Sequence, residues 1–133
     1  MRARMTSRLR IGFMATLLAL AGGLACNTPS VPLPPPALDS ISFQPGTASD
    51  TVFMQGQADS RFANSRFYVL NLTRNQGVIT DAAPDGSFTT DPFPGATGDT
   101  VEIYYDVPGG GERSPTVCTT LQIGAALIGS DCL

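Results

Sequence analysis

Three cysteines are the most distinctive chemical groups of this chain: Cys26, Cys118 and Cys132. Thiols of exported proteins normally pair as disulfides, so an odd number leaves one cysteine that needs a different role. Four arginines, an apolar run over residues 11–21 and several small residues precede Cys26, in the order of a secretion signal. If Cys26 carries a lipid as the first residue of the mature chain, Cys118 and Cys132 remain to form one disulfide.

The tripeptide Leu24-Ala25-Cys26 resembles the lipobox of bacterial lipoproteins, in which the cysteine is acylated and becomes residue one. The chain departs from that pattern at Gly23, where leucine is preferred. The resemblance implies a signal peptide over residues 1–25. Because Asn27 replaces the aspartate that retains many lipoproteins in the inner membrane, it also implies an outer-membrane location, on the periplasmic or surface face. Ordinary cleavage after Ala21 is the alternative and predicts a secreted protein with a free Cys26.

A proline-rich spacer follows the signal. Residues 26–38 hold Cys26 and five prolines, which remove backbone donors and exclude a helix or a central strand. As a polyproline II segment, residues 27–38 would reach about 37 Å. A plain tether explains this segment, and recognition by a proline-binding partner is the alternative. Residues 39–133 are enough for one modest core, so we expect a single domain held away from a membrane.

Charge and composition argue against several classes of function. Removal of residues 1–25 takes away four of eight basic residues and none of eleven acidic ones, so the mature charge is 4 − 11 = −7. An acidic domain of this kind has no basic stripe for nucleic acid. Histidine and lysine are absent, and there is no nucleophile elbow, phosphate-binding glycine loop or zinc-ligand spacing. We therefore expect no catalytic activity and no cofactor.

Four aspartates in or beside predicted turns have the hard oxygen ligands that calcium prefers: Asp81, Asp85, Asp91 and Asp99. Their spacing does not alternate as in a calcium-binding loop, and aspartate is a common turn residue for conformational reasons alone. The sequence therefore predicts no metal site.

Alternation of apolar and polar residues, interrupted by Gly, Pro, Asn and Asp, predicts an all-β domain. The clearest case places Val101, Ile103, Tyr105 and Val107 on a core face and Thr100, Glu102, Tyr104 and Asp106 on a solvent face. The runs cover residues 41–43, 51–58, 65–73, 77–82, 87–90, 100–107 and 116–123. About seven short strands are typical of an antiparallel β-sandwich.

The C-terminal tail predicts a hairpin around the loop 124–126. In that register Cys118 faces Cys132, with Cα atoms about 4.5 Å apart and within reach of a disulfide. Ile123 faces Leu127, and Val117 faces Leu133 on the apolar side. Val117, Thr119, Leu121 and Ile123 are predicted to share the core face of this strand.

Several segments resemble a bacterial immunoglobulin-like domain of cell-surface proteins over residues 39–120. They are Val52-Phe53-Met54-Gln55-Gly56-Gln57-Ala58, Asp85-Gly86-Ser87-Phe88, Gly98-Asp99-Thr100-Val101-Glu102-Ile103, Asp106, and the glycine loop up to Ser114-Pro115. The resemblance implies an immunoglobulin-like sandwich with about seven strands. The chain departs from the family in its single copy and its disulfide-closed tail. A transthyretin-like, carboxypeptidase-regulatory domain shares the Asp-Gly-x-Phe element and is the alternative. Neither fold implies a function.

In the immunoglobulin topology three loops meet at one end of the sandwich and often form a binding surface. The candidate binding residues are Arg61, Phe62, Asp85, Glu112 and Arg113 in these loops, and Tyr104 on the solvent face of its strand. Arginine beside an exposed aromatic residue is typical of a binding hot spot. An inward-facing Phe62 and a merely solubilising Arg61 are the alternative.

Together these features predict a non-catalytic domain anchored to the membrane by its lipid. We expect it to serve adhesion or to act as a structural or accessory subunit of a surface complex, with an envelope protein or a glycan as partner. A carbohydrate- or small-ligand-binding module is the alternative function.

Overall fold

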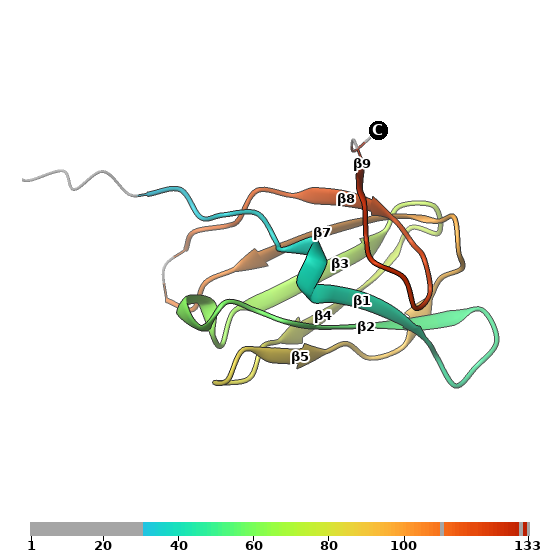
Figure 1. The fold of residues 1–133 in the computed structure, drawn as a ribbon, viewed down its shortest axis with the longest axis horizontal. Helices are drawn as coiled ribbons and strands as arrows, with labels where there is room; N and C mark the ends of the chain where they lie inside the picture. Colours follow the sequence, from blue (N-terminus) through green and yellow to red (C-terminus); the bar gives the residue numbers. More distant parts are fainter. Residues whose placement is uncertain (1–30, 110, 131, 133) are drawn as a thin grey trace, which may run out of the picture. The chain divides into compact units, whose positions relative to one another are not determined.

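In a computed structural model that describes residues 31–109, 111–130 and 132, two antiparallel sheets enclose one apolar core (Figure 1). In the first sheet, β2 (Thr51–Gln57) pairs on one side with β1 (Ile41–Pro45) and on the other, successively, with β5 (Ser87–Thr89) and β6 (Phe93–Pro94). The second sheet runs β4 (Gln76–Asp81), β3 (Arg66–Asn71), β7 (Thr100–Asp106), β8 (Val117–Thr120) and β9 (Gly129–Ser130). Two short 3-10 helices, η1 (Leu38–Ser40) and η2 (Ser60–Phe62), precede β1 and β3.

The strand order is that of an immunoglobulin-like sandwich. With β1, β2 and β5 in one sheet and β4, β3, β7 and β8 in the other, the strands correspond to ABE and C′CFG. The predicted fold class is confirmed. Beyond it, the short strand β6 extends the pairing along β2, and β9 extends the second sheet past β8.

Alternating side chains of the strands build the core. In β7, Val101, Ile103 and Tyr105 are buried while Glu102 and Tyr104 lie half-buried on the outer face, as the sequence predicts. This alternation follows from the two-residue period of a strand. The core is completed by buried side chains of the neighbouring strands, namely Phe43, Val52, Met54, Phe67, Val69, Phe88 and Phe93.

The predicted core face of the last long strand is wrong at its end. Thr119 and Leu121 are buried, but Ile123 is 42% exposed. The chain leaves β8 after Thr120 and crosses to the first sheet, where Ile123 forms a bridge with Phe43. The Gly124 N–H then donates to the Phe43 carbonyl at 2.9 Å. Ile123 therefore leaves the face that it would occupy in a continued strand.

The predicted disulfide between Cys118 and Cys132 is present, with a Cα–Cα distance of 5.2 Å. The predicted hairpin register is wrong by two residues, because Cys118 pairs with Ser130 and Thr119 with Gly129. The connection spans residues 121–128 and inserts Leu127 into the core. A shift of two residues keeps every side chain on its face, which explains why the disulfide survives the change of register. The predicted pairing of Val117 with Leu133 lies outside the described residues.

The compact unit begins at Pro32, within the segment predicted as the spacer. Leu33 and Leu38 pack against the core, and Pro36 is buried. The Tyr105 hydroxyl donates a hydrogen bond of 2.8 Å to the Pro34 carbonyl. Residues 32–38 therefore lie on the sandwich. The predicted signal peptide and Cys26 lie outside the described residues, and within the described part no helix is long and apolar enough to cross a membrane.

Candidate functional site

The three loops expected to carry binding residues lie at one end of the sandwich (Figure 1). Main-chain hydrogen bonds join two of them. The Ala58 N–H donates to Gly86 O at 2.8 Å, and the Ala82 N–H donates to Ser65 O at 2.8 Å. The third loop joins β7 to β8 and carries Glu112 and Arg113.

Arg61 and Phe62 have partners within their own region of the domain. The Arg61 guanidinium contacts both carboxylate oxygens of Asp59, at 3.1 and 2.8 Å, and these hydrogen bonds lower the pKa of Asp59 to about 2. The Phe62 ring packs against the core, 5.7 Å from the ring of Tyr105. Phe62 is thus part of the wall of the core, and Arg61 lies over its outer side with the guanidinium carbon 5.4 Å from the ring centre.

Asp85 and Glu112 take part in hydrogen bonds within their own loops. The Asp85 carboxylate accepts hydrogen bonds from the Ser87 hydroxyl at 2.7 Å and the Ser87 N–H at 2.9 Å, which lowers the pKa of Asp85. The Glu112 carbonyl accepts from the Val107 N–H at 3.3 Å, and the residue itself is exposed. The Asp85 side chain therefore has a local structural role, whereas Glu112 takes part in its loop through its main chain.

Arg113 instead joins Tyr104 on the outer face of the second sheet. The antiparallel register of β3 and β7 places Tyr68 opposite Tyr104, and their rings stack with centroids 4.8 Å apart at an angle of 14°. The Arg113 guanidinium carbon lies 4.5 Å from the Tyr104 centroid and 5.5 Å from that of Tyr68. Asp106 accepts two hydrogen bonds from Arg113, at 2.9 and 3.2 Å. We call Tyr68, Tyr104, Asp106 and Arg113 the aromatic platform.

Neighbouring charges set the protonation of this platform. Hydrogen bonds from Arg113 lower the pKa of Asp106, while partial burial and the Asp106 carboxylate raise the pKa of Tyr68. At neutral pH the platform therefore presents an ionised carboxylate, a guanidinium and a protonated phenol. Such a set can bind through stacking, apolar contact and hydrogen bonds.

Tyr68 and Asp106 are the members of this platform that were not among the candidate binding residues. Tyr68 and Tyr104 lie 36 positions apart in the chain. The burial pattern of the two strands places both tyrosines on the outer face, and the register of β3 and β7 brings their rings together. The sequence of a single strand does not show with which residues of a distant strand it pairs, so the stacking of Tyr68 on Tyr104 could not be predicted.

A second polar cluster fixes the loop before β7. Asp99 is 8% exposed, and its Oδ2 accepts from Asn71 Nδ2 at 2.8 Å, Arg74 Nε at 2.6 Å and the Ala96 N–H at 3.0 Å. Asn71 also donates to the Pro94 carbonyl at 3.1 Å. The cluster ties β3, its following turn and the 94–99 segment together, which is a structural role.

Three of the four aspartates considered as calcium ligands are held by other partners, while Asp91 is exposed. Asp81 pairs with Arg66 at 2.7 Å, Asp85 accepts from Ser87, and Asp99 accepts from Arg74. Across the residues that the structure describes, no three His, Cys, Asp or Glu side chains are grouped to hold a metal ion.

No protein-family model matches the chain, and no curated protein or solved structure is significantly similar to it.

Proposed function

We propose that this chain is a lipid-anchored protein of the bacterial cell envelope that presents a non-catalytic immunoglobulin-like domain to a protein partner. The role would be adhesion, or that of an accessory subunit in a surface complex. The signal-like N-terminus and Cys26 support the location. The aromatic platform is the single structural observation that supports binding.

The platform has the composition and the rigidity of a binding hot spot. Tyrosine and arginine are enriched among residues that dominate binding energies. The stacked rings and the doubly hydrogen-bonded Arg113 lose little side-chain freedom when a partner arrives, because Asp106 and Tyr68 already hold them. The surrounding strand face is half-exposed, so a flat partner surface can reach the rings.

Glycan binding is the alternative that the same tyrosines raise, since sugars stack on aromatic faces. The position of Arg113 argues against it. The guanidinium lies over the ring of Tyr104 at 4.5 Å, so a sugar stacking on that face would have to displace Arg113 from Asp106. We therefore favour a protein partner, to which Arg113 and Asp106 can both hydrogen-bond.

Photo-crosslinking in intact cells tests this proposal directly. A photoreactive phenylalanine derivative at Tyr104 should give a discrete adduct with one envelope protein, and Arg113→Ala in the same chain should abolish it. Phe53 is the matched control, because it is also a half-exposed aromatic side chain but lies on β2 in the other sheet. The same adduct from both positions, or none from Tyr104, would refute partner binding at the platform.

A glycan array with the purified protein distinguishes the alternative. Saturable binding that Tyr104→Ala removes and Phe53→Ala retains would identify a carbohydrate-binding module. Absence of array binding together with the crosslinked adduct is the result that we expect.

A further inference from the structure

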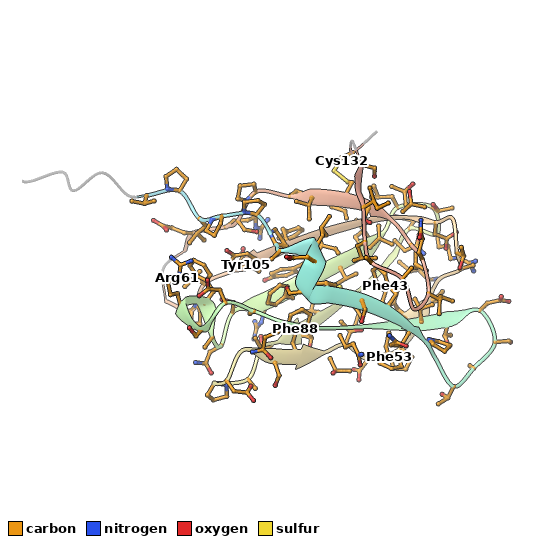
Figure 2. The ribbon with its side chains drawn as sticks, viewed as in Figure 1. Phe43, Phe53, Arg61, Phe88, Tyr105 and Cys132 are labelled. Carbon is orange, nitrogen blue, oxygen red and sulfur yellow. A yellow bond between two sulfur atoms is a disulfide. The ribbon has the colours of Figure 1, made fainter. Side chains whose placement is uncertain are left out.

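A cavity of about 180 Å³ lies at the loop end of the sandwich, between the core and the proline segment. Pro34, Pro35 and Pro36 form one wall, and the rings of Phe62, Phe67, Phe88 and Tyr105 form much of the rest. Figure 2 shows Tyr105 and Arg61 at the end of the sandwich along which the segment from residue 31 to η1 runs. The cavity therefore exists because residues 34–36 lie across the open end of the core.

The aromatic walls are rigid. Phe67 and Phe88 stack with centroids 4.2 Å apart at 18°, which joins the two sheets. Tyr105 lies 5.4 Å from Phe67 and 5.7 Å from Phe62. Side chains held in this way cannot easily collapse into the space, so the cavity is a stable feature of the fold.

The polar groups at the cavity already have partners. The Tyr105 hydroxyl donates to Pro34 O, Arg61 pairs with Asp59, and the Gln57 amide donates to the Asp85 carbonyl. A charged ligand would lose its hydration here without gaining an equivalent partner. An uncharged, apolar ligand has no such hydration to lose.

We propose that this cavity is a binding site for a small, uncharged and largely apolar molecule with one or two fused rings. The volume of the cavity fits a ligand of this size, because an apolar cavity of about 150 Å³ in another protein stays dry and binds benzene. The ligand would contact both the proline wall and the aromatic wall. Binding and docking of residues 34–36 would then favour each other by linkage. This site is separate from the aromatic platform and does not depend on the lipid anchor.

Methyl NMR of the full-length protein, labelled at alanine and isoleucine methyl groups, tests the proposal with indole as the probe. Ile41 and Ala58 line the cavity, whereas Ile79 and Ile123 are exposed and are not among its lining residues. We expect saturable shifts at Ile41 and Ala58 and none at Ile79 and Ile123. Equal shifts at all four positions, or none at Ile41 and Ala58 up to the solubility limit of indole, would overturn the proposal.

Two variants sharpen this test. Ala58→Phe should fill the cavity and abolish the indole shifts, while its control Ala125→Phe, in the exposed loop, should leave them unchanged. Tyr105→Phe keeps the ring but removes the hydrogen bond to Pro34, and we expect binding about fivefold weaker, the effect of one hydrogen bond. Tyr105→Phe remains informative if Ala58→Phe does not fold. Unchanged affinity in Tyr105→Phe would contradict the role of the proline wall.

Discussion

Asp99 illustrates how single residues hold this small domain together. Its carboxylate is nearly buried and accepts from Asn71, Arg74 and the Ala96 N–H, which belong to three different segments. A buried ionised group is stable only when hydrogen bonds and a counter-charge replace its hydration. The sequence places Asp99 in or beside a turn, and its partners Asn71 and Arg74 lie 28 and 25 positions away, so no local pattern shows this cluster.

Asp99→Asn should destabilise the domain by about 1–3 kcal/mol, since it leaves Arg74 without its counter-charge and replaces an acceptor oxygen by a donor. Urea unfolding followed by circular dichroism measures the change. Asp91→Asn is the control, because Asp91 is exposed, and its midpoint should match that of the unchanged protein. Equal stability of both variants would contradict the structural role of Asp99.

The aspartates also predict how stability depends on pH. Hydrogen bonds from arginine, asparagine, serine or main-chain groups lower the pKa values of the following residues in the folded state: Asp59, Asp81, Asp85, Asp99 and Asp106. A lowered folded pKa gives stability that is present above the unfolded value of about 3.9 and is lost as the pH falls through the folded value. The urea concentration at the unfolding midpoint should therefore decrease when the pH is lowered below about 4. Asp99→Asn should show a shallower decline, and a midpoint that rises on acidification would contradict the assignment.

At the scale of elements, the C-terminal tail closes one side of the sandwich. After β8 the chain crosses to β1, inserts Leu127 into the core and returns as β9. The disulfide joins Cys132 to β8, so this excursion is fixed at both ends. Figure 1 shows the tail in red, with its loop descending toward β1 and β9 beside β8.

Replacing both cysteines, Cys118→Ala with Cys132→Ala, should lower the free energy of unfolding by about 3 kcal/mol, the chain-entropy value for a loop of this length. Thermal unfolding of the double variant and of the reduced unchanged protein should agree, because both lack the same crosslink. A double variant as stable as the oxidised protein would show that the tail is held by its packing alone.

The parts of the fold that depend on local sequence patterns could be predicted, whereas the parts that depend on contacts between distant residues could not. The alternation in β7 and the turn residues between strands are local, so the sandwich could be predicted. The tail register depends on contacts of residues 121–128 with β1 and the core, which a hairpin alignment does not contain. Residues 32–38 show no alternation of apolar and polar residues, so nothing in the sequence indicated that Pro36 would be buried. Proline rings can pack on a surface without belonging to a strand.

For the candidate site, residue types were more predictable than their partners. Tyr104 and Arg113 were expected to be exposed and are joined by a contact that requires the β7–β8 connection to fold back over β7. Arg61 and Phe62 are close in sequence and remain close, but Phe62 packs inward because the core at this end is open.

At the scale of the whole molecule, docking of residues 32–38 shortens the free tether that the proposed anchor would have. Five residues, 27–31, separate Cys26 from the compact unit. Even fully extended they would span only about 18 Å. The domain would then lie close to the membrane, and the partner would be sought within the envelope.

Energy transfer from a dye at Glu112 to an acceptor lipid measures this proximity. Inserting ten Gly/Ser residues between Ser30 and Val31 should lower the transfer efficiency, because the flexible insert lengthens the tether. A ten-residue insertion at the exposed turn residue Ser49 is the control and should change little. Equal efficiency in all three proteins would contradict a tether-limited position.

The intact mass of the protein from the membrane fraction, before and after reduction and thiol alkylation, tests the central claim most directly. We expect a chain that starts at Cys26 with the added mass of acyl groups and shows two reactive thiols only after reduction. A chain that starts elsewhere, without lipid and with Cys26 free or crosslinked to another chain, would contradict the proposed anchor.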